Sequence, residues 1–387
     1  MRKSALLWFG LVVTVIVALG LVVLSTASGA NAARLHHGDA FYFMRRQFEY
    51  LAVGIMLCAS VAMFDYRQWR NHMTLTWLFY GVVLVLLLLV FKYKAINGSH
   101  RWINLGFLRL QPSEFAKLVT VIVVAAWMDR SAWRVELFTR GALLPALFVG
   151  VLALPVMLEP DFGSTMVVGV VGFMLMFVAG ARVLHLLPIM ALGGAAVVAK
   201  VATNANRMAR IAAFFGGGDG SAPMDEAARR AAFQAEASLA AIGNSDIWGA
   251  GLGQSMQKYL YLPEAHTDFV FAIGAEELGI VFSVGTVVLF TAFFALSVYI
   301  ARKASDRFGR YLVIGMAFII YFQAMFNIGV ICKALPTKGM ALPFFSYGGT
   351  NLLSAFFAVG TILSVGIHSY RESKWKKSVL ARSRFQS

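Results

Sequence analysis

The chain has 387 residues, of which 59% are hydrophobic and only 14% are charged, and its formal net charge is +15. Soluble globular domains carry about 25% charged residues, so this composition excludes an ordinary soluble protein. The positive charge suggests an anionic partner, but the basic residues are dispersed among hydrophobic segments. This argues against nucleic acid and favours membrane lipid, in particular a lipid phosphate or diphosphate.

Hydrophobic segments long enough to cross a bilayer recur along the chain. Segments of this kind must be helical, because unpaired backbone groups are too costly in lipid. The sequence therefore predicts an all-α fold, a polytopic integral membrane bundle of about ten transmembrane helices. The predicted spans lie near 5–25, 48–64, 73–91, 113–129, 141–158, 163–180, 184–200, 269–300, 311–332 and 346–369.

The positions of the basic residues predict the orientation of the chain. The first apolar run is too long for the core of a cleavable signal peptide, and an even number of spans places both termini on one side. Segments rich in Lys and Arg predict that this side is the cytoplasm; they lie at 67–70, 130–140, 182, 302–310 and 371–384. We expect a membrane domain over 1–370, with a large periplasmic loop at about 203–266, and a basic cytoplasmic tail over 371–387.

The first polar cluster is HRWINLGFLRLQPSEFAK, residues 100–117, which places Arg101, Arg109, Glu114 and Lys117 at the mouth of a span. An ionisable group near lipid costs a few kcal/mol unless it is paired or hydrated. The cluster therefore predicts a polar, mainly cationic site inside the bundle. The alternative is that these long side chains simply extend to the membrane interface.

Three further features suggest no site. Asp-Phe-Gly at 161–163 matches a kinase motif, but the other kinase elements are missing. The glycine run in the outer loop lacks the Gly-Lys-Ser/Thr of a phosphate-binding loop. Cys58 and Cys332 lie within or beside spans without metal-ligand spacing, and are interpreted as core residues rather than a disulfide.

The second polar cluster is YLPEAHTDFVFAIGAEELG, residues 261–279. Asp268 lies at the start of a long span, where a helix N-terminus favours a carboxylate, and Glu264 and His266 are close by. This position at the membrane–water boundary favours a functional role for Asp268. Glu276 and Glu277 lie deeper, and at least one of them needs a basic partner in the bundle, so structural ion pairing is the alternative there.

The third polar cluster is KALPTKGMALPFFSYGGTNLL, residues 333–353, where prolines and glycines interrupt a hydrophobic stretch. Irregular backbone at membrane depth is tolerated only when it is buried in protein or lines a polar cavity. We expect Lys338, Ser346 and Tyr347 to project into such a cavity. The alternative is a re-entrant turn with no ligand. Thr350 and Asn351 are expected to lie outside the chemistry.

A single boundary carboxylate surrounded by cations suits a transfer reaction with a good leaving group. A lipid diphosphate departs without protonation, whereas hydrolysis of an ordinary glycoside requires two carboxyl groups. One base would deprotonate the acceptor hydroxyl, and Arg and Lys would stabilise the departing diphosphate. Direct displacement of this kind would invert the anomeric centre.

The segments RWINLGFLRLQPSEFAKL, PEAHTDFVFAIGAEELG and LPTKGMALPFFSYGGTNLL together resemble the SEDS family of bacterial membrane proteins (shape, elongation, division and sporulation). They occur in the family's order and spacing, and the resemblance extends from the first span to about residue 370. LPTKG before PFFSYGG is more similar to the division member than to the elongation member. The resemblance implies a peptidoglycan glycosyltransferase that polymerises lipid II at the outer face of the bacterial cytoplasmic (inner) membrane, at the division septum. Its implied partners are a class B penicillin-binding transpeptidase and other divisome membrane proteins.

The resemblance also implies residue roles. The family's essential acid corresponds to Asp268, the base for the incoming sugar 4-hydroxyl, and its basic positions suited to the diphosphate correspond to Arg109 and Lys117. The full set expected to bind substrate is Arg101, Arg109, Glu114, Lys117, Glu264, His266, Lys338, Ser346 and Tyr347. No metal-ligating cluster such as Asp-x-Asp is present, so a divalent cation such as Mg²⁺ would be held partly by the substrate diphosphate. A lipid II flippase or a non-catalytic scaffold is the alternative function.

Overall fold

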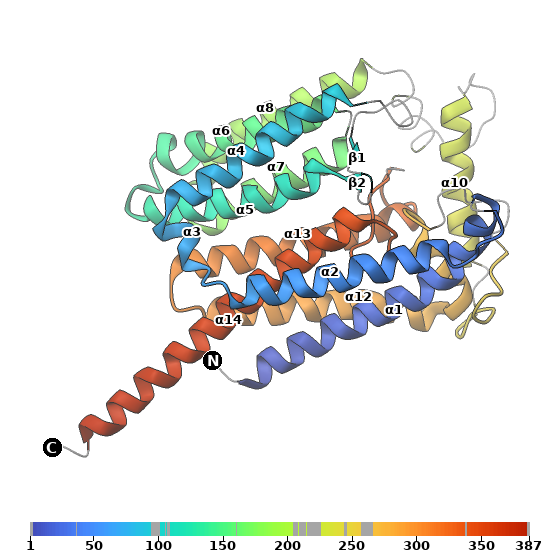
Figure 1. The fold of residues 1–387 in the computed structure, drawn as a ribbon. Coiled ribbons are helices and arrows are strands. Elements are labelled where there is room, and N and C mark those ends of the chain that lie inside the picture. The colour runs from blue at the N-terminus through green and yellow to red at the C-terminus, as the bar shows by residue number, and fades with distance from the viewer. Residues whose placement is uncertain are drawn as a thin grey trace.

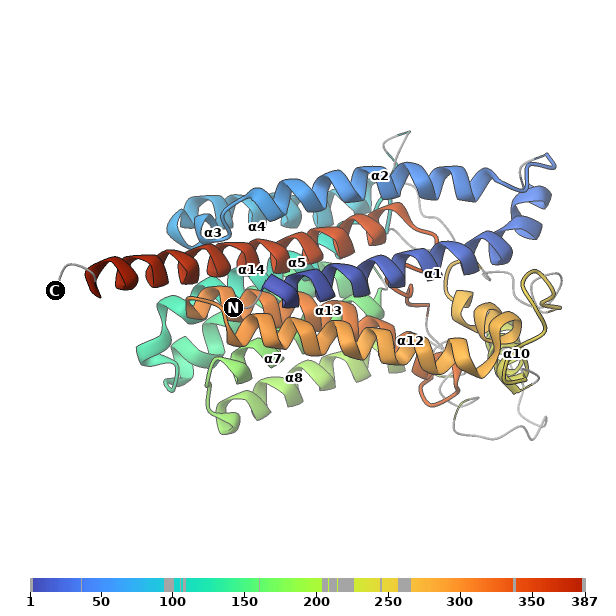
Figure 2. The ribbon, with the colours of Figure 1, turned by 90° about the horizontal axis from the view of Figure 1, so that it is seen from below.

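The computed structural model describes residues 3–35, 37–93, 101–104, 106, 109–159, 161–203, 208, 214, 226–243, 246–256, 266–336 and 339–384. The long helices run side by side as one elongated bundle (Figures 1 and 2). The helices and strands are α1 (Lys3–Leu35), α2 (Tyr42–Met63), α3 (Arg67–Asn71), α4 (Met73–Leu89), η1 (Val90–Lys92), β1 (Ile103–Asn104), β2 (Arg109–Leu110), α5 (Pro112–Arg130), η2 (Ala132–Arg134), η3 (Phe138–Leu143), α6 (Leu144–Leu158), α7 (Phe162–Val178), α8 (Val183–Ala202), α10 (Glu226–Gly243), α12 (Val270–Arg302), α13 (Arg307–Ile331) and α14 (Gly349–Arg384).

The predicted all-α membrane bundle is confirmed, and in the described part of the chain every predicted span coincides with a helix. Seven helical segments are long and apolar enough to cross a membrane, and α7 is a shorter apolar helix. The helices α2 and α5 are not among the seven, because each contains several ionisable side chains. In α5, Glu114 and Lys117 belong to the first polar cluster, whereas Asp129 and Arg130 lie at the opposite end of the helix.

The helix α5 lies at the centre of the bundle. Nearly all of its side chains are buried, because α4, α6, α7, α13 and α14 all pack against it. A helix surrounded in this way can be apolar on every face. Pro112 begins the helix, at a position where the missing N–H costs nothing. The first turns of α5 therefore carry Glu114 and Lys117 into the interior of the protein.

The molecule has two distinct ends. The N-terminus and α3 lie at one end, which we call the terminal end, and the β1–β2 hairpin and α10 lie at the other, which we call the hairpin end (Figure 1). The helix α14 does not stop at residue 370 but continues to Arg384 and projects beyond the bundle at the terminal end (Figure 2). The basic segment 371–384 is thus a direct extension of a spanning helix.

At the hairpin end, the segment 246–256 is docked on a kink in α12. Gly279 has φ 76° and ψ −164° inside this helix, a conformation that is essentially restricted to glycine. The kink frees the N–H groups of Ile280 and Val281, which donate to the carbonyls of Asp246 and Ile247 at 3.3 Å each. The segment 246–256 is therefore anchored to a membrane helix.

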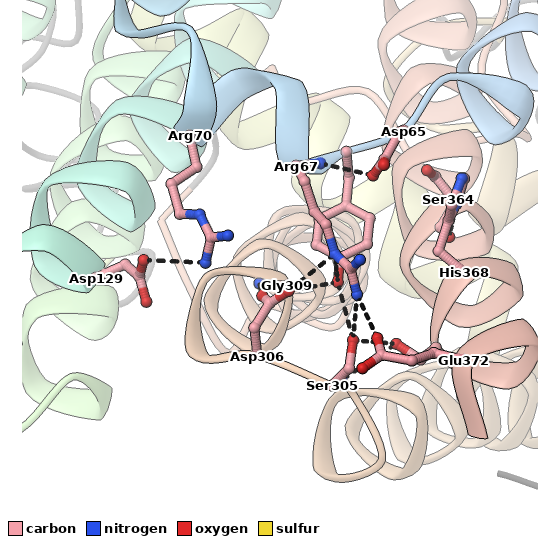
Figure 3. A network of polar contacts seen from close by, with 12 residues as sticks. Asp65, Arg67, Arg70, Asp129, Ser305, Asp306, Gly309, Ser364, His368 and Glu372 are labelled. Carbon is pink, nitrogen blue, oxygen red and sulfur yellow. Dashed lines mark hydrogen bonds and ion pairs between the residues drawn. The ribbon is translucent and has the colours of Figure 1, made fainter. Parts of the chain in front are cut away.

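At the terminal end, a polar network joins three parts of the chain (Figure 3). Arg67 in α3 donates to the Ser305 hydroxyl at 2.8 Å and to the Glu372 carboxylate at 2.5 Å. The Tyr66 hydroxyl donates to Asp306 at 2.7 Å. Because Ser305 and Asp306 lie between α12 and α13, and Glu372 lies on α14, the network fixes the relative positions of these helices.

Candidate functional site

The first and third polar clusters meet at the hairpin end. The strands β1 and β2 form a short antiparallel pair in which Asn104 lies opposite Arg109. The Thr350 hydroxyl donates to the Arg109 carbonyl at 2.7 Å and accepts from the Gln111 N–H at 3.2 Å. Thr350, which was expected to lie outside the chemistry, therefore joins the hairpin to the start of α14.

Glu114 and Lys117 form a buried ion pair. Their side chains are only 7% and 1% exposed, and Lys117 Nζ lies 2.7 Å from Glu114 Oε1. The Ser354 hydroxyl of α14 donates to the other carboxylate oxygen at 2.8 Å. Two members of the predicted site are thus brought together, although here the charge of Lys117 is balanced by Glu114. Arg109 is exposed on the hairpin.

Asp268 is half-buried in the turn just before α12. Its carboxylate lies against Gly339 so closely that a Cβ at Gly339 would be 2.5 Å from Asp268 Oδ2. Asn327 of α13 donates from Nδ2 to the Asp268 carbonyl at 2.9 Å and to the Met340 carbonyl at 2.7 Å. The second and third clusters are therefore held together by Asn327, which the sequence analysis missed. The signal that could have identified Asn327 is a side-chain amide within an apolar span.

His266 and Tyr347 also lie together. The His266 ring stacks on Phe43 of α2 with a centroid distance of 4.6 Å, and the Tyr347 ring packs edge-on against Phe43 at 4.8 Å. The Tyr347 N–H donates to the His266 carbonyl at 2.9 Å. This arrangement links α2, the Asp268 segment and the start of α14. Contact of either side chain with substrate stays a prediction.

Ser346 is buried, with 1% of its surface exposed. Its hydroxyl accepts from the Leu342 N–H at 2.7 Å, and its own N–H donates to the Leu342 carbonyl at 3.0 Å. These bonds close the loop that precedes α14. The hydroxyl is thus used by the irregular backbone itself, and a contact of Ser346 with substrate stays a prediction. Glu264 and Lys338 lie outside the described residues.

Arg101 lies near two acidic residues at the junction of α6 and α7. Its Nε donates to the Glu159 carbonyl at 3.5 Å. Asp161, dismissed in the sequence analysis, caps α7 by accepting from the Ser164 N–H at 3.2 Å and also accepts from Gln111 Nε2 at 3.2 Å. It therefore connects α7 to the start of α5. The signal that could have found it is an Asp directly after an apolar span.

Glu159 is fully buried, and neither of its carboxylate oxygens has a hydrogen-bond partner among the residues that the structure describes. It follows the last residue of α6 and lies outside the membrane-spanning segment. Burial, reinforced by the neighbouring Asp161 carboxylate and partly offset by Arg101, raises the pKa of Glu159 to about 8. A buried acid of this kind is mostly neutral at pH 7.

Glu276 and Glu277 accept hydrogen bonds from the docked segment 246–256. The Glu276 carboxylate accepts from the Ser255 hydroxyl and from the Met256 N–H at 3.1 Å, and Glu277 accepts from the Ser255 N–H at 3.4 Å. For Glu276 the donors are neutral groups, whereas a basic partner was expected for at least one of the two glutamates. Both residues therefore contribute to anchoring the segment 246–256.

Within the described ranges, no group of three or more His, Cys, Asp or Glu side chains converges in a way that could hold a metal ion. Asp161, the acid nearest to Glu159 in sequence, already accepts hydrogen bonds from Gln111, Ser113 and Ser164. A divalent cation held partly by the substrate diphosphate stays a prediction.

The site therefore combines a boundary carboxylate, a buried Lys–Glu pair and an exposed arginine at one end of a membrane bundle. The family model described as "Cell cycle protein" (FTSW_RODA_SPOVE) matches residues 6–371. The chain belongs to the SEDS family. The predicted resemblance is confirmed.

Curated relatives align with nearly the whole length of this chain. A protein of Coxiella burnetii named "Probable peptidoglycan glycosyltransferase FtsW" is 34% identical over 368 residues, covering 92% of this chain and 95% of the relative. A protein of the same name from Escherichia coli O157:H7 is 36% identical over 372 residues, covering 94% and 86%. These relatives carry the name of the division member.

Solved SEDS structures share the fold. A structure described as "Structural coordination of polymerization and crosslinking by a peptidoglycan synthase complex" aligns with a TM-score of 0.72 and 28% identity, covering 94% of this chain and 97% of that one. The rod shape determining protein RodA of Thermus thermophilus aligns with a TM-score of 0.66 and 27% identity, covering 94% and 96%. The helical architecture described above is therefore that of the SEDS family.

Proposed function

We propose that this chain is a peptidoglycan glycosyltransferase that polymerises lipid II for septal wall synthesis. The observation that carries the proposal is the placement of Asp268. Its carboxylate is held at the end of a membrane bundle against Gly339, while Asn327 fixes its backbone. The curated relatives are named for this activity and for the division protein FtsW.

The reaction needs one base and an anion-stabilising environment. Asp268 removes the proton from the 4-hydroxyl of the acceptor sugar as that oxygen attacks the anomeric carbon of the donor. The bond from the anomeric carbon to the diphosphate oxygen breaks, and undecaprenyl diphosphate leaves with the electron pair. Arg109, which is exposed on the hairpin, is suited to stabilise that negative charge, whereas the charge of Lys117 is balanced by Glu114 before substrate binds. Attack from the opposite face inverts the anomeric centre.

The proposed membrane arrangement follows from the charge distribution. The terminal end carries α3 and the Arg67 network, together with the basic extension of α14. Under the positive-inside rule this end faces the cytoplasm, and the hairpin end faces outward, where lipid II is polymerised. A class B penicillin-binding transpeptidase is the proposed partner, since a related structure is described as a complex that coordinates polymerization and crosslinking.

The test is lipid II polymerisation by the purified chain together with its cognate transpeptidase. Asp268→Asn should reduce glycan synthesis at least about 100-fold, because the amide cannot accept the proton. Asp246→Asn is the matched control, since Asp246 is an exposed acid in the same outer region and should retain wild-type activity. Folding of each variant is checked by thermal unfolding in detergent.

Equal polymerisation by the wild type and Asp268→Asn would remove Asp268 from the chemistry. Lipid II binding without glycan synthesis by the wild type would instead favour a flippase or a scaffold. A transbilayer lipid II transport assay in vesicles then separates these two alternatives.

A further inference from the structure

The docked segment 246–256 exposes large apolar side chains, although it lies outside the helices that are long enough to cross a membrane. Trp248 and Met256 are each 76% exposed, and Ile247 and Leu252 are more than half exposed. The segment contains a single ionisable side chain. Single apolar side chains on a surface are ordinary, whereas several gathered in one short segment mark a contact with protein or membrane.

The polar groups of this segment are bonded to α12. The N–H groups of Ala250 and Gly251 donate to the carbonyls of Glu276 and Glu277 at 2.9 Å each. The Met256 N–H donates to the Glu276 carboxylate at 3.1 Å. The protein therefore satisfies the backbone of the segment and leaves its apolar side chains outside. A loop that faced water would be expected to show the opposite arrangement.

The kink on which the segment docks lies at the depth of a bilayer boundary. The helix from Gly279 to the basic residue Arg302 is roughly 35 Å long at about 1.5 Å per residue. The hydrocarbon core of a bilayer is about 30 Å thick. With Arg302 at one boundary of the core, the helix therefore reaches the headgroup region of the other leaflet at the kink. Tryptophan is enriched at this depth, because its ring is apolar and its N–H is polar.

The exposed surface of the segment continues an apolar face of α12. Ile280, Val281 and Val284 follow the kink and are each about half exposed, on a helix that is long and apolar enough to cross a membrane. The Val281 N–H donates to the Ile247 carbonyl at 3.3 Å, so the segment adjoins this face. Because lipid tails are as apolar as these side chains, an uncovered face of a spanning helix packs against lipid. The continuity therefore favours lipid as the partner of the segment as well.

We propose that the segment 246–256 is an interfacial anchor that binds the leaflet at the hairpin end. Its partner is the boundary between phospholipid headgroups and acyl chains. Apolar side chains gain free energy when they leave water at this boundary, while the Trp248 N–H stays within reach of headgroup oxygens. The side chains inserted into the leaflet are Ile247, Trp248, Leu252 and Met256.

The experiment measures tryptophan fluorescence of the full-length chain in phosphatidylcholine vesicles. The Trp248 signal is the difference between wild type and Trp248→Phe, because every other tryptophan is common to both. Phosphatidylcholine brominated near the headgroup should remove most of this signal, and phosphatidylcholine brominated near the chain ends should remove less of it. Trp77→Phe is the matched control, since Trp77 lies in the membrane-spanning segment Met73–Lys92 and its signal should also be quenched by brominated lipid.

Iodide dissolved on both sides of the vesicle membrane separates lipid contact from the alternatives. The anchor predicts that iodide leaves most of the Trp248 signal intact. Quenching by iodide and not by brominated lipid would overturn the proposal, because the segment would then face water. Quenching by neither would also overturn it, in favour of a contact with a second copy of the chain. Both substitutions replace one aromatic ring with another, and Trp248 is mostly exposed, so the variants should fold as the wild type does.

Discussion

Asn327 shows how one side chain can set the geometry of the segment that carries Asp268. It is 2% exposed, and its Nδ2 donates hydrogen bonds to two backbone carbonyls from different segments, those of Asp268 and Met340. Both acceptors are carbonyl oxygens, so only the NH₂ side of the amide can face them. Asn327 is therefore a positioning residue for Asp268 rather than a group that contacts substrate.

We expect Asn327→Leu to leave two carbonyls unpaired and to release the Asp268 segment. Displacement of a reacting group by about 1 Å can cost about 100-fold in rate, so the turnover number should fall by about that factor while lipid II binding changes less than about twofold. Steady-state polymerisation kinetics supply both numbers. Gln323→Leu is the control, because Gln323 is a buried amide one turn away on α13. Turnover above half the wild-type value would remove Asn327 from this role.

Glu159 predicts a pH dependence of stability. Its folded-state pKa of about 8 exceeds the ordinary value of 4.5, so the folded protein holds a proton that the unfolded chain releases. Stability from this group is present below pH 4.5 and is lost as the pH rises toward about 8. The unfolding temperature in detergent should therefore fall over this window, and Glu159→Gln should flatten the curve. An identical slope in wild type and variant would contradict the prediction.

At the scale of elements, the kink of α12 depends on a close approach of two backbones. A Cβ at Gly279 would contact Gly249 N and Ile247 O and would lie 2.5 Å from Asp246 O. A Cβ at Gly249 would in turn lie 2.5 Å from the Glu277 carbonyl. The outer segment can dock on the helix only because both positions are glycine.

We expect Gly279→Ala to destabilise the protein by about 3 kcal/mol or more, because alanine is strained at this φ and has no space. Thermal unfolding and protease cleavage within 246–256 measure the loss of docking. Gly285→Ala on the same helix is the control, since a Cβ there would meet nothing within 4 Å and should be neutral or slightly stabilising. Equal stability of the two variants would refute the docking argument.

At the scale of the whole molecule, the Arg67 network and the proposed site lie at opposite ends of the bundle. The Arg67 network ties α3, the α12–α13 connection and α14 together at the terminal end (Figure 3). The proposed site lies at the hairpin end. Changes in the network should therefore affect folding more than they affect the reaction.

We expect Arg67→Met to lower stability by about 2 kcal/mol, because it removes the charged hydrogen bonds that join α3 to Ser305, Asp306 and Glu372. Polymerisation per folded molecule should be unchanged. Arg182→Met is the control, since Arg182 and Glu136 are 61% and 66% exposed and such pairs contribute about 1 kcal/mol or less. A selective loss of activity in Arg67→Met would show instead that the two ends are coupled.

The sequence by itself determined the membrane bundle and its helices, because the bilayer imposes a hydrophobic length that each span meets locally. It also identified the three segments that converge and placed Asp268 at a helix start. Only the tertiary structure decided the contacts between them. Thr350 and Arg109 are separated by 241 residues, and Asn327 and Asp268 by 59. Hydropathy and spacing carry no information about such partners, which is why the contacts of Thr350, Asn327 and Asp161 were missed.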